Sequence, residues 1–142
     1  MDCVIDVSFA GCWFLDDESN PEGRSVLSNY EKGIVQFHVP QLWVYELPNA
    51  LLMAHRLKRL DAEKYAKAKQ AFASMHFIYH EQADSICGNR IFDFAEKFEL
   101  TAYDAGYLEL ADRLQFPLLT LDKELLAAAK RKNISTSLNF KK

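Results

Sequence analysis

The stretch MDCVIDVS, residues 1–8, decides the fold class. Residues 3–5 form a continuous apolar, β-prone run, and Asp6 ends it. Ser8 is a good N-cap, so we expect a helix to start there and to run through Phe14. An apolar strand that passes directly into a helix is typical of a parallel sheet with helices packed on it. Ligands bind at the carboxyl ends of the strands in such sheets, which is where Asp6 lies.

Patterns of strand and helix alternate along the rest of the chain. Further strands are predicted at residues 34–39, 76–80 and 117–121, with a short closing strand at 134–138. Helices are predicted at residues 22–32, 61–75, 83–98 and 123–132, with one opened by Pro40 and another beginning within 100–104. Pro48 should kink the Pro40 helix or make it restart near Glu46. This alternation predicts an α/β fold in a single domain over residues 1–142: a three-layer α/β/α sandwich with a central, mostly parallel sheet.

Composition excludes several classes of protein. A length of 142 residues with 49% hydrophobic and 26% charged residues is typical of one globular domain. The net charge of −3 gives no general attraction to nucleic acid, so any polyanion must bind at local basic patches. No apolar run approaches the roughly 20 residues of a membrane span, and we find no signal peptide. Cys3, Cys12 and Cys87 are odd in number and form no CxxC pair, so we expect reduced core cysteines in a cytoplasmic protein.

Four acidic residues occupy informative positions. Asp6 and Asp122 each end a predicted strand, Asp104 lies at the start of a helix, and Glu46 lies early in the helix after the second strand. These positions share one edge of a parallel α/β sheet, so we expect the four carboxylates in one cleft. Clustered carboxylates repel one another unless protons or a divalent cation neutralise them. Oxygen ligands suit Mg²⁺ or Mn²⁺, which orient phosphates and activate water.

Each acid also has a structural explanation. Thr101 and Asp104 have the spacing of a capping box, and Asp122 could cap the helix that follows it. Glu46 could be a solvated helix residue. For any one acid the structural explanation is the stronger, but no packing reason would place all four at the same edge.

Four motifs carry a family resemblance. The segments VIDVS (4–8), PQLWVYELPNAL (40–51), LTAYDAGYLELA (100–111) and LTLD (119–122) resemble the successive motifs of PIN-domain ribonucleases, most closely the VapC toxins of type II toxin–antitoxin pairs. The resemblance extends from residue 2 to about residue 135. It implies an endoribonuclease that depends on Mg²⁺ or Mn²⁺, is usually a homodimer and is inhibited by a small antitoxin protein.

The resemblance also implies roles for individual residues. Asp6 and Asp104 fall on the main metal ligands of the family, and Glu46 and Asp122 on its remaining acidic positions. The polar residues expected to support these acids are Ser8, Asn49, Thr101 and Thr120. The candidate contacts to the RNA backbone are Arg56, Lys58 and Arg59, which alternatively are a solvated helix end that complements the helix dipole. Pro48 departs from the family pattern and puts the orientation of Glu46 in doubt.

The sequence thus predicts a metal-dependent endoribonuclease and leaves two alternatives. One is a catalytically silent PIN-like module that binds a protein partner; a complete set of repelling acids argues against it. The other is a metal-dependent phosphatase on a similar sheet, although no Asp-x-Asp follows the first strand as in haloacid dehalogenases. HExxH, GxSxG, P-loop and GxGxxG motifs are absent from the sequence. Apolar residues within 26–30 and 47–57 indicate a homodimer with a groove for an antitoxin helix.

Overall fold

A single parallel sheet organises the protein. The computed structural model describes residues 1–82 and 84–140, and its four strands lie in the order β3-β2-β1-β4. The strands are β1 (Asp2–Ile5), β2 (Gln36–Pro40), β3 (Phe77–His80) and β4 (Leu118–Leu119). Val4 lies opposite both His38 and Leu118, so β1 is paired on both sides. Because all strands run the same way, their carboxyl ends share one edge of the sheet.

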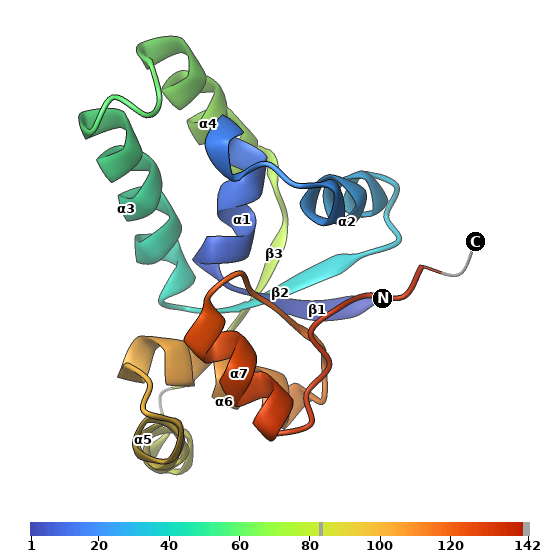
Figure 1. The fold of residues 1–142 in the computed structure, drawn as a ribbon, viewed down its shortest axis with the longest axis vertical. Coiled ribbons are helices and arrows are strands. Elements are labelled where there is room, and N and C mark those ends of the chain that lie inside the picture. Colours follow the sequence, from blue (N-terminus) through green and yellow to red (C-terminus); the bar gives the residue numbers. More distant parts are fainter. Residues whose placement is uncertain (83, 141–142) are drawn as a thin grey trace.

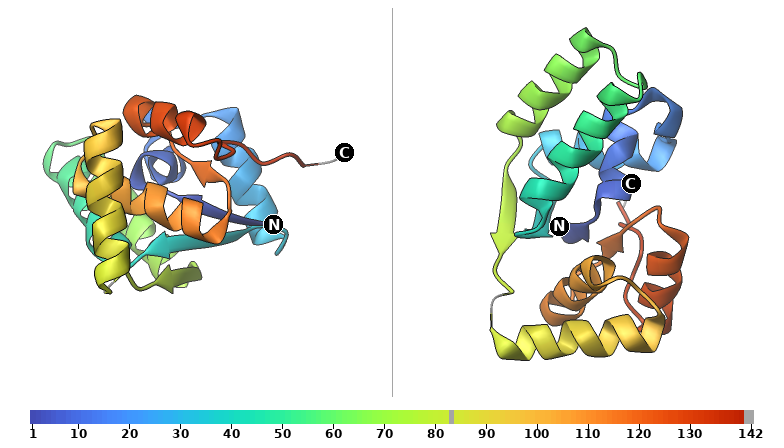
Figure 2. Two further views of the ribbon diagram at one scale, coloured as in Figure 1. Left: turned by 90° about the horizontal axis from the view of Figure 1, so that it is seen from below. Right: turned by 90° about the vertical axis from the view of Figure 1, so that its left-hand side faces the viewer.

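Helices cover both faces of this sheet, which confirms the predicted three-layer architecture (Figures 1 and 2). One layer contains α1 (Val7–Phe14), α2 (Pro21–Glu31), α3 (Trp43–Arg56) and α4 (Ala62–Ser74), with a short 3₁₀ turn, η1 (Asp16–Glu18), after α1. The other contains α5 (Ser85–Phe98), α6 (Ala102–Leu114) and α7 (Lys123–Arg131).

The core lies around β1 and α6. Cys3, Val4 and Ile5 are fully buried, as the unbroken apolar run of β1 predicts for a central strand. In α6 every residue from Ala105 to Ala111 is buried, because this helix packs against β1 and β2 and is flanked by α5 and α7. Asp6 and Asp104 therefore lie at the ends of two of the most buried elements of the fold.

Two helix starts differ from the prediction. Asp6, and not Ser8, caps α1, because its carboxylate accepts a hydrogen bond from the N–H of Phe9 at 2.9 Å. Pro40 ends β2 instead of opening a helix, and α3 begins at Trp43. This helix continues through Pro48 without interruption. The carbonyl that loses its partner there is that of Val44, an exposed residue in the first turn, where water can satisfy it.

The predicted closing strand at residues 134–138 does not form. Ser135 accepts one hydrogen bond from the N–H of Leu118 at 2.8 Å, but β4 has only two residues and offers too few groups for a ladder. β4 is also shorter than the predicted 117–121. Residue 83, where a helix was predicted to begin, lies outside the described residues, and α5 begins at Ser85 with Asp84 as its N-cap.

The cysteines lie where the sequence predicted. Cys3, Cys12 and Cys87 are all buried and free. Within residues 1–82 and 84–140, the helices are too short or too polar to cross a membrane.

Candidate active site

Asp6 is held between β1 and β4 at the carboxyl edge of the sheet. It is 5% exposed. Its carboxylate accepts hydrogen bonds from the hydroxyls of Ser8 at 2.8 Å and Thr120 at 2.6 Å, besides the capping bond from Phe9. Burial raises the pKa of Asp6, these three hydrogen bonds oppose the rise, and the charge of Asp104 adds to it. Asp6 is therefore a fixed carboxylate that gains a proton more readily than an exposed aspartate.

The fourth predicted acid, Asp122, contacts the two hydroxyl donors of Asp6 through its backbone. Its N–H donates to the hydroxyl oxygens of Ser8 (3.1 Å) and Thr120 (3.0 Å). Its carboxylate instead caps α7, accepting from the N–H of Leu125 at 2.8 Å. Asp122 is not among the charges that raise the pKa values of Asp6 and Glu46. In this structure its side chain has the capping geometry that was the alternative to a ligand.

Glu46 projects from the first turn of α3 and is fixed by a tyrosine. Its carboxylate accepts a hydrogen bond of 2.5 Å from the hydroxyl of Tyr107, a buried residue of α6. Burial is the main cause that raises the pKa of Glu46; the bond from Tyr107 opposes it, and the charges of Asp104 and Asp6 increase it. The same carboxylate and burial raise the pKa of Tyr107 well above its ordinary value, so Tyr107 stays a hydrogen-bond donor.

Asp104 begins α6 and forms the predicted capping arrangement. Its N–H donates to the Thr101 hydroxyl oxygen at 3.1 Å, and that hydroxyl donates to the Asp104 carboxylate at 2.8 Å. Asp104 is also close enough to Asp6 and Glu46 for its charge to raise the pKa values of both. Capping and membership of the acidic cluster are therefore compatible at this residue.

Three of the four predicted acids are near enough for their charges to affect one another: Asp6 after β1, Glu46 in α3 and Asp104 in α6. Among the described residues, no Lys, Arg or His side chain makes an ion pair with any of them. Nor do residues 1–82 and 84–140 contain three His, Cys, Asp or Glu side chains grouped closely enough to hold a metal ion. Each of the three carboxylates instead accepts a hydrogen bond from a hydroxyl group: Asp6 from Ser8 and Thr120, Glu46 from Tyr107, and Asp104 from Thr101. The donor set still suits Mg²⁺ or Mn²⁺, since all the donors are oxygen and the charge is unneutralised.

Tyr107 is the site residue that sequence reasoning missed. It follows Asp104 by three positions, so the two lie on neighbouring parts of one helix face. That spacing was visible in the sequence, but its partner Glu46 is 61 positions away and only the tertiary fold shows it.

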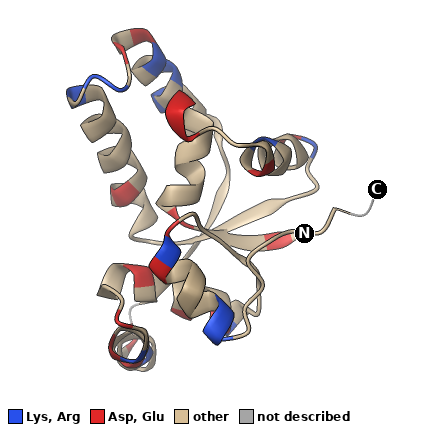
Figure 3. Cartoon of the chain, in the orientation of Figure 1, with Lys and Arg blue, Asp and Glu red and all other residues tan. Residues whose placement is uncertain are grey.

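The predicted peripheral residues lie in different places. Asn49 is exposed and borders a cavity next to Glu46. Arg59 is paired with Asp17 and Glu18, at 2.9 and 2.6 Å. The exposed Arg56 lies at the opposite end of α3 from Glu46, about 15 Å along its axis at 1.5 Å per residue, and the exposed Lys58 lies in the turn after that end. Figure 3 shows this basic end of α3 far from the edge where the strands end.

Comparison with known proteins gives two similarities. The chain is 27% identical over 128 residues to Ribonuclease VapC3 of Pyrobaculum aerophilum, a match that covers 88% of this chain and 92% of that protein. The crystal structure of PAE2754 from Pyrobaculum aerophilum is similar in fold, with a TM-score of 0.64 and 25% identity over 90% of this chain and 79% of that one. No family model matches the chain. Both similarities extend over most of the chain, so they concern the whole α/β fold and not an isolated motif.

Proposed function

We propose that this protein is a divalent-metal-dependent endoribonuclease of the VapC-like PIN type, and the toxin of a toxin–antitoxin pair. The observation that carries the proposal is the convergence of Asp6, Glu46 and Asp104 at one sheet edge without a cationic partner. A purely structural role gives no reason to place two further carboxylates, Glu46 and Asp104, where their charges disfavour ionisation of the buried Asp6 or of each other. The similarity to Ribonuclease VapC3 over most of the chain supports the same function.

We assign a different role to each acid. Asp6 and Asp104 would hold Mg²⁺ or Mn²⁺, and Glu46 would be a further ligand or would orient the attacking water. The bound cation supplies charge that polarises the scissile phosphate and lowers the pKa of water. Ser8 and Thr120 keep the Asp6 carboxylate turned toward the edge, as Tyr107 does for Glu46. Asp122 is the fourth acidic position, and its N–H helps to fix Ser8 and Thr120.

Two partners belong to the proposal. A second copy of the chain would pack on the exposed apolar residues Met53 and Leu57 of α3. A small antitoxin protein would use the apolar cavity of about 530 Å³ between α1, α2 and α4, whose walls include Trp13, Leu27 and Met75. Most of the other apolar residues within 47–57 are not available to a partner, since Leu47, Leu51 and Ala54 are buried in the core. Light scattering at tens of micromolar protein tests the dimer; a monomer there contradicts it.

Cleavage of RNA with and without Mg²⁺ tests the enzymatic function. We expect cleavage of a single-stranded RNA in Mg²⁺ and none in EDTA. Mg²⁺ should also raise the melting temperature, because it binds the folded state alone. Asp6→Asn should lose both effects, whereas Asp93→Asn, the same change at an exposed position of α5, should keep them. Undiminished cleavage in EDTA, or by the Asp6 variant, would contradict the proposal.

A further inference from the structure

Two exposed tyrosines flank the acidic cluster. Tyr45 immediately precedes Glu46 in α3, and Tyr103 immediately precedes Asp104 in α6. They are 78% and 66% exposed. A large aromatic ring in water stabilises nothing by burial, so packing does not explain either residue. Successive side chains of a helix point about 100° apart, so each tyrosine side chain points in a different direction from the acid that follows it and does not cover that carboxylate.

Both tyrosines border the same cavity. It has a volume of about 330 Å³ and its walls are Leu42, Tyr45, Glu46, Asn49 and Tyr103. This volume lies in the range of small-molecule sites. Among the described residues, the aromatic contacts do not involve either tyrosine, so neither ring is stacked on another. Glu46 belongs to the cavity and to the acidic cluster, so the two sites are continuous.

From this arrangement we infer that the cavity binds one unpaired nucleobase of the substrate, next to the phosphate held at the acids, with Tyr45 and Tyr103 as its stacking surfaces. The inference rests on the proposed nuclease function and assigns that site its substrate contacts. Leu42 contributes an apolar wall, and the Asn49 amide offers both a donor and an acceptor to a base edge. A base inside a duplex is already stacked and paired, so the cavity selects single strands.

The charge distribution explains why stacking is needed here. RNA-binding sites usually gain affinity from Lys and Arg contacts to phosphates. In this protein Arg59 is paired with Asp17 and Glu18. Arg56 lies about 15 Å from Glu46 along α3, and Lys58 lies in the turn beyond it. The acids themselves repel phosphate until a cation is bound. Stacking of a base on an aromatic ring works without positive charge and tolerates every base, because each has a π-face.

A protein segment is the competing occupant of this cavity. Tyrosine is common in protein interfaces, and the second chain proposed above would lie on the same helix. The base is favoured because the cavity shares Glu46 with the cluster, while the apolar residues of α3 that suit a second chain, Met53 and Leu57, lie toward its other end.

The test measures binding separately from cleavage. A single-stranded RNA containing the fluorescent base 2-aminopurine is titrated with full-length protein in EDTA and in Mg²⁺, and the same strand annealed to its complement is the comparison. Quenching of the base reports stacking. Tyr45→Leu and Tyr103→Leu should each weaken single-strand binding about five-fold to a hundred-fold, and Tyr45→Phe should restore it. Tyr79→Leu, the same change at an exposed tyrosine of β3, is the control and should bind normally.

The results separate this inference from the nuclease proposal. Loss of quenching in the two leucine variants supports the base site even if the protein cleaves no RNA. Normal binding and a normal KM in both variants overturn the base site and leave the nuclease intact. Equal affinity for the duplex, or no quenching by the parental protein in either buffer, also overturns it. A change only in light scattering would assign the tyrosines to a protein interface and would overturn it too.

Discussion

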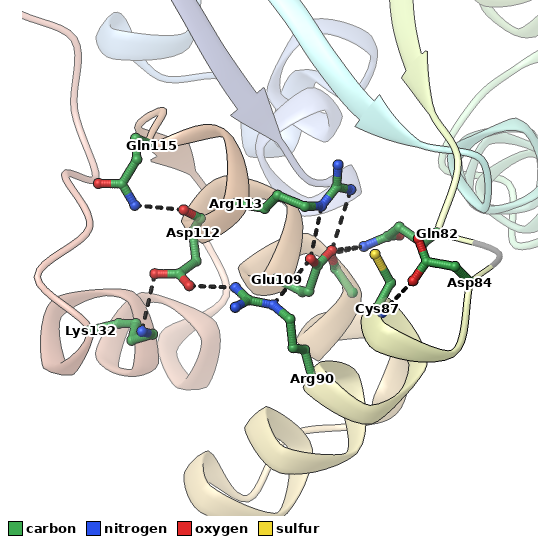
Figure 4. Close-up of polar contacts among 10 residues, drawn as sticks. Gln82, Asp84, Cys87, Arg90, Glu109, Asp112, Arg113, Gln115 and Lys132 are labelled. Atoms are coloured by element: carbon green, nitrogen blue, oxygen red, sulfur yellow. Dashed lines mark hydrogen bonds and ion pairs between the residues drawn. The ribbon is translucent and has the colours of Figure 1, made fainter.

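Two of the acids in helix α6, Glu109 and Asp104, have opposite surroundings. Glu109, in the middle of the helix, is fully buried, but Arg113 donates to it at 2.9 Å and Gln82 at 2.6 Å. Arg90 Nε lies 3.4 Å from it, near enough for attraction but without a hydrogen bond. Figure 4 shows this cluster, in which Asp112 also pairs with Arg90 and Lys132. Asp104, one and a half turns earlier, has a hydroxyl partner and two repelling acids.

The two acids differ in where their countercharge comes from. In the Glu109 cluster the protein supplies the countercharge itself, so the energy of burial is compensated within the chain. At the sheet edge no side chain among the described residues supplies it, and burial with repulsion raises the pKa values of Asp6 and Glu46. Buried titratable groups with perturbed pKa values are more common at functional sites.

The largest effect is expected when an amide replaces Asp104. Asp104→Asn removes a proposed metal ligand, so RNA cleavage in saturating Mg²⁺ should fall about a thousand-fold, because the cation supplies several kcal/mol to the transition state. The metal-free protein should be as stable as the parent or more so, since the charge that repels Asp6 and Glu46 is gone. The measurements are cleavage rates and thermal melts in EDTA. A less stable variant that cleaves normally would make Asp104 a helix cap alone.

A smaller loss is expected when Asp6 keeps its charge and loses one donor. Thr120→Val deletes the 2.6 Å hydrogen bond to its carboxylate while keeping the shape of the side chain. The Mg²⁺ concentration that gives half-maximal cleavage should rise about 10- to 100-fold, the usual effect of removing a group that orients a metal ligand. A titration of cleavage rate against Mg²⁺ measures it. Thr136→Val, at a threonine outside the site, is the control, and equal Mg²⁺ curves for both variants would speak against the role of Thr120.

At Glu109 the pattern should be reversed. Glu109→Gln removes the countercharge of Arg113 and leaves Arg90 with Asp112 alone, so it should lower the free energy of unfolding by about 2 kcal/mol. This is less than for a wholly buried pair, because the side chains of Arg113 and Arg90 are 33% and 36% exposed. Cleavage by the folded variant should be unchanged. Urea unfolding measures the loss of stability. Cleavage rates should be measured about 20 °C below the melting temperature of the variant, where a domain of this size is still folded. Loss of cleavage with unchanged stability would place Glu109 in the site.

The smallest effect is a pH dependence confined to the metal-free protein. Asp6 and Glu46 have folded-state pKa values above their ordinary values of 3.8 and 4.5, so the folded protein binds their protons more tightly than the unfolded chain. Their contribution to stability is therefore present below about pH 4 and is lost as the pH rises through the raised pKa values. Saturating Mg²⁺ should remove this loss. Urea titrations in EDTA for the parent and Glu46→Gln should differ across that range; parallel curves would contradict the shift.

Local sequence signals were enough for most of the strands and helices. The unbroken run Cys3–Ile5 followed by Asp6 correctly placed a central strand and its carboxyl end, because a strand buried on both faces cannot alternate polar residues. The helix predicted at residues 61–75 forms as α4 and is capped by Asp61, because an N-cap is a contact between residues three apart. Pro40 and residues 134–138 misled the prediction. Whether a segment ends a strand or pairs as one depends on what lies beside it, and residues 134–138 share only the hydrogen bond from Leu118 to Ser135 with β4.

The tertiary structure alone decided how the acids are held and which of them meet. In sequence Asp122 is equivalent to Asp6, since both follow a predicted strand. In the structure the Asp122 carboxylate caps α7, and its N–H donates to Ser8, which in turn donates to Asp6. Tyr107 belongs to the site because its hydroxyl donates to Glu46, a residue of another helix. Sequence records the chemistry of a side chain and its neighbours within a few residues. The direction of that side chain depends on donors and charges that come from distant parts of the chain, and only packing brings those together.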